Sequence, residues 1–275
     1  YPLTLTLPPK ADEEGAKPTD LTIAISQPGM MMTASGTPEA TSYDYSAPSA
    51  TVKLEAIEGV DADKVDATVE ATLTNLKGKY LVDGDETARK VTSGLSIGGM
   101  ALAVIANDAE TDSDVRITAN IADISTSSES NLLGPDSMVD LAKALADGMT
   151  IKGLFSHGAT EFDISVTESD KPTTIKGSAA SGTMNLEMDA SHFAYGVGSK
   201  GVAIAISSPD IPVPEVKATY DETSFSMLMP VGKTAAPADA GLMMRIVGLA
   251  VSDEIWGMID PAGSLPHDPA TVALD

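Results

Sequence analysis

The chain has 275 residues, of which 43% are hydrophobic and 21% are charged, which is the composition of a folded protein and not of a disordered one. Its 40 acidic residues exceed its 17 basic residues, and the net charge of −23 argues against binding to nucleic acid and against charge-driven attachment to anionic lipid headgroups. The absence of cysteine excludes disulfides, thiol nucleophiles and cysteine-ligated metals.

Apolar residues occupy every second position in a series of segments along the chain. These segments are 21–25, 65–73, 115–121, 162–166, 184–188 and 202–206. Alternate side chains of a strand point to opposite faces, so this pattern is typical of antiparallel strands with one apolar and one solvated face. Turn-forming sequences separate the segments at 82–86, 168–172 and 179–183. The sequence therefore predicts a mainly β protein, an antiparallel meander that forms a strongly curved sheet, a sandwich or an open barrel.

Residues 135–148 interrupt the strands and predict a helix, because apolar residues recur there at helical spacing on one face. Those residues are Met138, Leu141, Ala142 and Leu145. Asp136 or Ser137 can cap the start of this helix, and Gly148 suits its end.

A second short helix is expected near the C-terminus. Ser252 precedes Asp253 and Glu254, and acidic residues are favourable at a helix N-terminus. The helix is expected to stop at Pro261. Trp256, the only tryptophan, is expected to pack this helix against the sheet.

No apolar run reaches the roughly 18 residues that a transmembrane helix requires. The nearest run, 241–251, is interrupted by Arg245. We therefore expect no transmembrane segment.

Two distant stretches of the chain are nearly identical: LTIAISQPG at 21–29 and VAIAISSPD at 202–210. SYDYS at 42–46 corresponds to TYDET at 219–223 with a similar separation. Two matched blocks at a similar offset favour a repeated strand–turn–strand unit over two copies of a binding site.

Both ends of the sequence look cut, since it opens at Tyr1 and closes within a strand-like stretch. We expect residues 1–275 to be one β-rich region of a longer chain. One interpretation of the matched blocks divides this region into repeat halves, 1–134 and 150–275, joined by the helix at 135–148.

GLSIG at 94–98 matches the G-x-S-x-G pattern of hydrolases, with Ser96 in the nucleophile position. That motif requires a strand before the serine and a helix after it, whereas the following residues read as another strand. The three histidines, His157, His192 and His267, lie in no recognisable acid–base setting. A strand with a local glycine kink is the favoured interpretation.

DAETDSD at 108–114 spaces its acids like the start of a calcium-binding loop. An EF-hand loop beginning at Asp108 would need glycine where Ser113 stands, so a solvated hairpin turn is favoured, and the same holds for 59–66. No phosphate loop, dinucleotide fingerprint, zinc spacing or carboxylate pair appears. We expect no cofactor, no metal and no catalytic residue.

Three blocks together resemble the alphaproteobacterial family called domain of unknown function 2125. They are 35–49, 211–231 and, most specifically, 249–275. The resemblance implies a Gram-negative periplasmic protein made with a signal peptide and extending beyond both ends of this sequence. It implies no activity, ligand or catalytic residue. His267 departs from the arginine expected before DPAT.

The expected function is a non-catalytic periplasmic binding or envelope-maintenance role. Methionine is plentiful, with 13 residues, and only 4% of residues are aromatic, which suits a flexible hydrophobic or lipid ligand such as an acyl-chain amphiphile. The residues expected to line its site are Met184, Leu186, Met188, Val202, Ile204 and Ile206. Closure of the same face into an ordinary core is the other interpretation of these residues. The alternative function is a serine hydrolase that uses Ser96.

Overall fold

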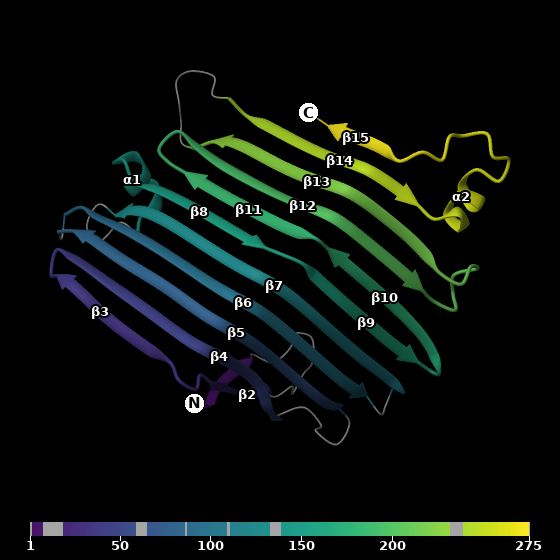
Figure 1. Cartoon of the computed structure of the whole chain (residues 1–275), viewed down its shortest axis with the longest axis horizontal. Coiled ribbons are helices and arrows are strands. Elements are labelled where there is room, and N and C mark those ends of the chain that lie inside the picture. The colour runs from purple at the N-terminus through teal and green to yellow at the C-terminus, as the bar shows by residue number, and fades with distance from the viewer. Residues whose placement is uncertain are drawn as a thin grey trace, which may run out of the picture.

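The computed structural model describes residues 2–7, 19–58, 65–85, 87–108, 111–132, 139–231 and 239–274. Within these ranges the chain forms fifteen strands and two helices, and every strand belongs to one antiparallel sheet (Figure 1). The prediction of a mainly β, antiparallel fold is therefore confirmed.

The bounds of the elements are as follows. The first strands are β1 (Pro2–Leu7), β2 (Thr19–Ser26), β3 (Met31–Thr37), β4 (Ala40–Glu58), β5 (Val65–Gly84), β6 (Arg89–Asp108) and β7 (Ser113–Leu132). Helix α1 (Leu141–Ala146) follows, and then β8 (Thr150–His157), β9 (Thr160–Glu168), β10 (Lys171–Ala179), β11 (Ser181–Met188) and β12 (His192–Ser207). The chain ends with β13 (Val216–Pro230), β14 (Gly241–Val251), α2 (Asp253–Ile259) and β15 (Ala270–Leu274).

The sheet is an up-and-down meander in which neighbours in the chain are neighbours in the sheet. At three places, two consecutive short strands together pair along one long strand. β2 and β3 both pair with β4, β8 and β9 both pair with β7, and β10 and β11 both pair with β12. Figure 1 shows the strands in a single layer from β3 to β15. Among the described residues β1 pairs only with β2 and β15 only with β14, so the sheet is open.

The interruptions lie on one line across the sheet, which we call the seam. Its residues are Gly29, Pro48, Asn75, Gly98, Asp123, Gly158, Ala180, Gly201, Asp221 and Gly248. The backbone pairing skips these positions, and five of them have a left-handed backbone: Gly29, Asn75, Asp123, Gly201 and Gly248. Such residues act like β-bulges, which bend strands and increase their twist.

The alternation of apolar and polar side chains changes phase at the seam. On β7 the odd-numbered residues from Val115 to Ile121 are half-buried and the even-numbered ones are exposed, but beyond Asp123 the buried residue is Ile124. Residues three apart therefore share a face across the seam, as they do where the Thr160 hydroxyl lies 3.0 Å from His157 Nδ1. One face of the sheet, which we call the apolar face, consequently carries most of the half-buried apolar side chains, and the other, the polar face, carries the cross-strand ion pairs.

Helix α1 is shorter than the helix predicted at 135–148. Its N-cap is Asp140, whose carboxylate accepts a hydrogen bond from the Lys143 backbone N–H at 3.0 Å. Asp136 and Ser137, the predicted caps, lie outside the described residues, as does Met138. Gly148 follows the helix with φ of +103°, as predicted for its end.

The face predicted for this helix is only partly correct. The buried residues of α1 are Ala144 and Leu145, while Leu141 is 40% exposed and Ala142 is exposed as well. Because the helix has only six residues, it covers the sheet with little more than these two side chains and the following Met149, which is fully buried.

Helix α2 begins after Ser252, with Asp253 and Glu254 in its first turn, as predicted. Trp256, expected to pack this helix against the sheet, is half-buried and makes a ring contact within the C-terminal segment. Its indole stacks on the imidazole of His267, with ring centroids 4.3 Å apart and an interplanar angle of 5°, so it holds the loop that follows the helix. No helix in the described part of the chain is long and apolar enough to cross a membrane.

Candidate ligand-binding face

The apolar face contains a row of β-branched aliphatic side chains that crosses seven strands. We call it the aliphatic row, and it consists of Val69, Val104, Ile117, Ile164, Ile175, Ile206 and Val216. Each residue is the direct cross-strand partner of the next, so the side chains touch along the row. All seven are half-buried.

A second row lies two positions closer to the seam and crosses ten strands without a polar side chain. It consists of Ile25, Val52, Ala71, Leu102, Ala119, Phe162, Gly177, Ile204, Ala218 and Val251. We call the part of the sheet that carries these two rows the aliphatic half.

The other side of the seam, which we call the hydroxyl half, has a different chemistry on the same face. Tyr43, Tyr80, Ser93 and Ser128 are successive cross-strand partners on β4, β5, β6 and β7, and we call these four residues the hydroxyl row. The two serine oxygens lie 2.8 Å apart, and the two tyrosine ring centroids lie 6.4 Å apart. Gly153, Leu186, Tyr195 and Met227 continue the line across the next strands.

The apolar face has no second layer over it in the described residues. Contacts join the strands that are neighbours in the sheet, and a few join α2 to β13, while Figure 1 shows the described strands from β3 to β15 as one layer. The accessible surface is 17427 Å², whereas size scaling gives roughly 11,200 Å² for a compact protein of 28.2 kDa. Buried apolar side chains are few in the part of the chain that the structure describes, and several of them lie beside the seam: Ala47, Ala50, Ile97, Ile124 and Val202.

The six residues predicted to line a binding site all lie on this face, in two groups. Met184, Leu186 and Met188 are on β11 in the hydroxyl half, and their partners across the ladder are Val197, Tyr195 and Phe193. Val202, Ile204 and Ile206 are on β12 in the aliphatic half. The structure therefore does not place the two groups opposite each other, because the seam at Gly201 separates them.

A hollow in the hydroxyl half lies next to the seam. Its volume is about 370 Å³, and Phe155, His157, Met184, Val197 and Phe225 contribute to its walls. His157 is half-buried, with its ring 5.9 Å from the Phe155 ring and its Nδ1 2.9 Å from the Gly158 carbonyl oxygen. Its polar lining residues are His157, Thr183, Ser199 and Thr223, and largely apolar walls with a few polar groups are typical of a site for a largely apolar ligand.

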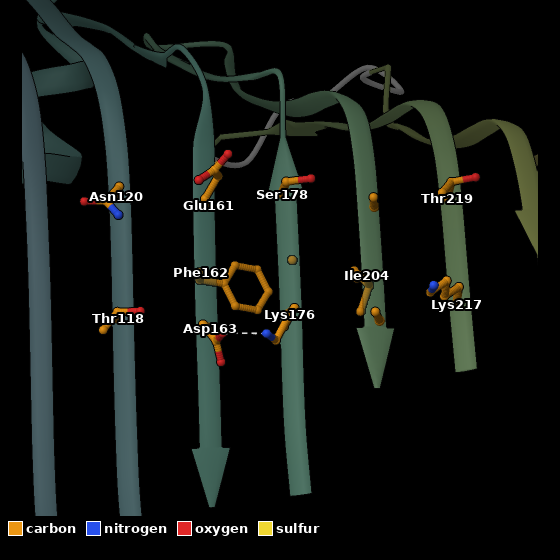
Figure 2. A pocket seen from close by; sticks show the side chains of 13 residues that line it. Thr118, Asn120, Glu161, Phe162, Asp163, Lys176, Ser178, Ile204, Lys217 and Thr219 are labelled. Carbon is orange, nitrogen blue, oxygen red and sulfur yellow. Dashed lines mark ion pairs between the residues drawn. The ribbon is translucent and has the colours of Figure 1, made fainter. Parts of the chain in front are cut away.

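The opposite face of the sheet carries the cross-strand ion pairs. Figure 2 shows the residues that line a shallow groove of about 450 Å³, most of them on this face, together with Phe162 and Ile204 of the second row. Its polar lining residues are Thr118, Asn120, Glu161, Asp163, Lys176, Ser178, Lys217 and Thr219. Asp163 and Lys176 form an ion pair of 3.1 Å there, and Lys53–Glu70, Lys90–Glu129 and Lys152–Glu187 pair across strands on the same face. Exposed pairs of this kind contribute little stability, so they mark the solvated side.

Ser96 also lies on the polar face. It is exposed within the 20-residue strand β6, and its hydroxyl donates a hydrogen bond to the Lys77 carbonyl at 3.5 Å. The strand-to-helix turn of a nucleophile elbow is absent at this position, and the kink expected here lies at Gly98, on the seam.

In the acidic stretch at 108–114, Asp108 pairs with Ser113 between β6 and β7 and Asp112 has a left-handed φ of 49°, while 109–110 lie outside the described residues. Of the other acidic stretch, 59–66, residues 59–64 lie outside the described ranges, and Val65 and Asp66 begin β5. In the ranges that are described, no group of three or more His, Asp or Glu side chains is arranged to hold a metal ion.

Two carboxylates with lowered pKa values, Asp189 and Asp260, accept hydrogen bonds from nearby residues in the turns that follow them. Asp189 Oδ1 accepts hydrogen bonds from the Ser191 hydroxyl and backbone N–H, both at 2.7 Å, and these bonds lower the pKa of Asp189 to about 2. The backbone N–H groups of Leu265 and Ser264 likewise lower the pKa of Asp260. Both groups are ionised at neutral pH and hold loops between elements.

Comparisons with protein families, with curated proteins and with solved structures find no match for this chain. The candidate site therefore rests on the geometry of the sheet. Sequence reasoning found the apolar alternation but missed the seam and the hydroxyl row. The available signal for the seam was Asn75 and Asp123 within long strand patterns, since both residue types are depleted in strands and tolerate a left-handed backbone.

Proposed function

We propose that this protein is a non-catalytic, periplasmic binding protein that holds an acyl-chain amphiphile on the apolar face of its sheet. The observation that carries the proposal is the aliphatic row, seven β-branched side chains without a charge, on a face that no second layer covers in the described residues. Large exposed apolar surfaces in proteins mark binding sites.

The charge of the chain supports a lipid over a second copy as the occupant. Two copies face to face would each bring a net charge of −23, which opposes their association, whereas an acyl chain brings none. The composition of the surface supports a flexible chain over a rigid ring as the ligand, because aliphatic and methionine side chains cover it over many strands. A 20-residue strand such as β7 extends about 65 Å, which accommodates a long chain.

The test uses two variants on neighbouring positions of β7 that point to opposite faces. Ile117→Asn places an amide on the apolar face, and Thr118→Asn places the same amide on the polar face as a matched control. Binding of a fluorescent long-chain acyl probe is measured after circular dichroism has confirmed strand content. Loss of one large apolar contact is expected to weaken binding roughly 10-fold in Ile117→Asn and to leave Thr118→Asn unchanged.

The proposal fails if the unmodified protein does not bind the probe, or if the two variants bind it equally. Native mass spectrometry of protein isolated from the periplasm, followed by lipid extraction, gives an independent result. Recovery of an acyl-chain lipid with the protein supports the proposal, and recovery of the protein from another compartment contradicts its periplasmic part.

A further inference from the structure

The two halves of the apolar face offer different chemistry to one ligand. In the aliphatic half, the side chains of the aliphatic row have no hydrogen-bonding atoms, and those of the second row have none either. In the hydroxyl half, Tyr43, Tyr80, Ser93 and Ser128 bring four hydroxyl groups to four adjacent strands. A ligand that lies along the strands meets both regions, because the long strands β5, β6 and β7 each cross the seam.

We infer that the amphiphile lies along the strands with its acyl chain over the aliphatic half and its head at the hydroxyl row, and that this head is uncharged and hydrogen-bonding. This inference rests on the proposed function, because it orients the ligand of the same face.

The hydroxyl row favours an uncharged head because its four side chains end in hydroxyl groups and none of them is charged. Serine and tyrosine hydroxyls both donate and accept, so they pair with the ester and hydroxyl oxygens of an acylglycerol. None of the four residues is cationic, and the row belongs to a chain with a net charge of −23. An anionic head placed there would find no arginine or lysine of the row to pair with, since Arg89, the cation on this face of β6, lies four residues beyond Ser93 and donates to the Asp85 carbonyl oxygen, and the overall charge would repel the head.

The exposure of the row agrees with this role. Tyr80 is 41% exposed and Ser128 is exposed, so their hydroxyls are accessible from the apolar face. The Ser93 and Ser128 oxygens lie 2.8 Å apart and share one hydrogen bond, which leaves acceptor positions on both for a ligand.

Orientation is tested with single cysteines on β7, which is possible because the chain has none of its own. Ala119→Cys labels the aliphatic half and Ser128→Cys labels the hydroxyl row, roughly 30 Å apart along the strand. Thr118→Cys and Ser127→Cys are the matched controls on the polar face. Each variant carries a fluorophore and is saturated with a monoacylglycerol brominated either near the chain terminus or next to the ester.

The chain-terminal bromine is expected to quench the label at 119 several-fold more than the label at 128, and the ester-proximal bromine the reverse, with both controls unquenched. Equal quenching at both apolar-face positions, or the opposite order, shows that the ligand binds without this orientation and overturns the inference alone. No quenching at any position, together with no binding by equilibrium dialysis, contradicts the proposed function itself.

Head selectivity is measured by competition at pH 8 with two ligands of the same chain length. The monoacylglycerol is expected to displace the acyl probe at least 10-fold more effectively than the fatty-acid anion. Equal or better displacement by the anion overturns the uncharged head and leaves the proposed function standing.

Discussion

The seam positions with a left-handed backbone are occupied by residue types that tolerate this conformation. Asn75 and Asp123 have φ values of 54° and 51°, and asparagine and aspartate adopt this region more readily than other non-glycine residues. Gly248 has φ of 67°, and a Cβ built there would lie 2.2 Å from Asp221 Oδ2. The Asp221 carboxylate therefore occupies the space that this glycine leaves, which locks two neighbouring strands together at the bend.

Gly248→Ala is expected to destabilise the fold. Alanine in the left-handed region costs about 1–2 kcal/mol, and displacement of the Asp221 carboxylate adds to that cost. Gly241→Ala on the same strand is the matched control, since its Cβ would meet no atom within 4 Å. Urea unfolding followed by circular dichroism measures both free energies of unfolding. Equal values for the two variants would show that the seam does not require glycine at 248.

The hairpin between β11 and β12 shows how one side chain organises the connection between two elements. Asp189 Oδ1 accepts from the Ser191 hydroxyl and N–H at 2.7 Å and from the His192 N–H at 3.0 Å. This closes a tight turn of the kind that aspartate forms with the residues that follow it. The strands on either side then meet in register, with Met188 opposite Phe193.

Stability is expected to depend on pH through this turn. The hydrogen bonds lower the pKa of Asp189 from an ordinary value of 3.8 to about 2, so the ionised carboxylate stabilises the folded state above pH 3.8. That contribution is lost as the pH falls from about 4 to about 2. Asp189→Asn is expected to be less stable than the natural protein at pH 6 and nearly equal to it at pH 2, measured by urea midpoints. A gap that stays constant between these pH values would contradict this role.

At the scale of the elements, the sequence predicted what is local and missed what depends on neighbours. The alternation at 115–121 is a property of one strand, and the structure reproduces it residue by residue. The phase change after Asp123 depends on a single backbone angle that no hydrophobic pattern reveals. Period-two reasoning therefore named Met184 and Ile204 as apolar-face residues but could not place them on opposite sides of the seam.

The matched blocks at 21–29 and 202–210 occupy different places in the sheet. The first is the end of β2 and the seam at Gly29, while the second is the end of β12 and the turn that leads to β13. Similar sequences thus serve two kinds of strand end, since serine, proline and glycine suit both. The division into repeat halves stays a prediction.

At the scale of the whole molecule, the sequence left a curved sheet, a sandwich and an open barrel as alternatives. All three present strands with one apolar face, so alternation alone cannot tell whether that face meets a second layer. The structure has one open sheet, and its accessible surface of 17427 Å² is about one and a half times the value expected from size scaling. A single-layer sheet leaves both of its faces without a covering layer, which raises the accessible surface above that of a compact protein.

Ligand binding on that face is expected to protect Met184 from oxidation and to leave Met258 unprotected. Met184 is 39% exposed in the hydroxyl half, between Val197 and Phe155 on the neighbouring strands, and exposed thioethers react with peroxide to form sulfoxides. A saturating monoacylglycerol should cover its sulfur and slow its oxidation several-fold. Met258, which is 51% exposed on α2 and outside the apolar face, should oxidise at an unchanged rate.

Peptide mapping by mass spectrometry after timed peroxide exposure measures both rates in one sample. Equal slowing of both residues would indicate a general effect of the lipid on peroxide, and an unchanged rate at Met184 under saturation would place the ligand elsewhere.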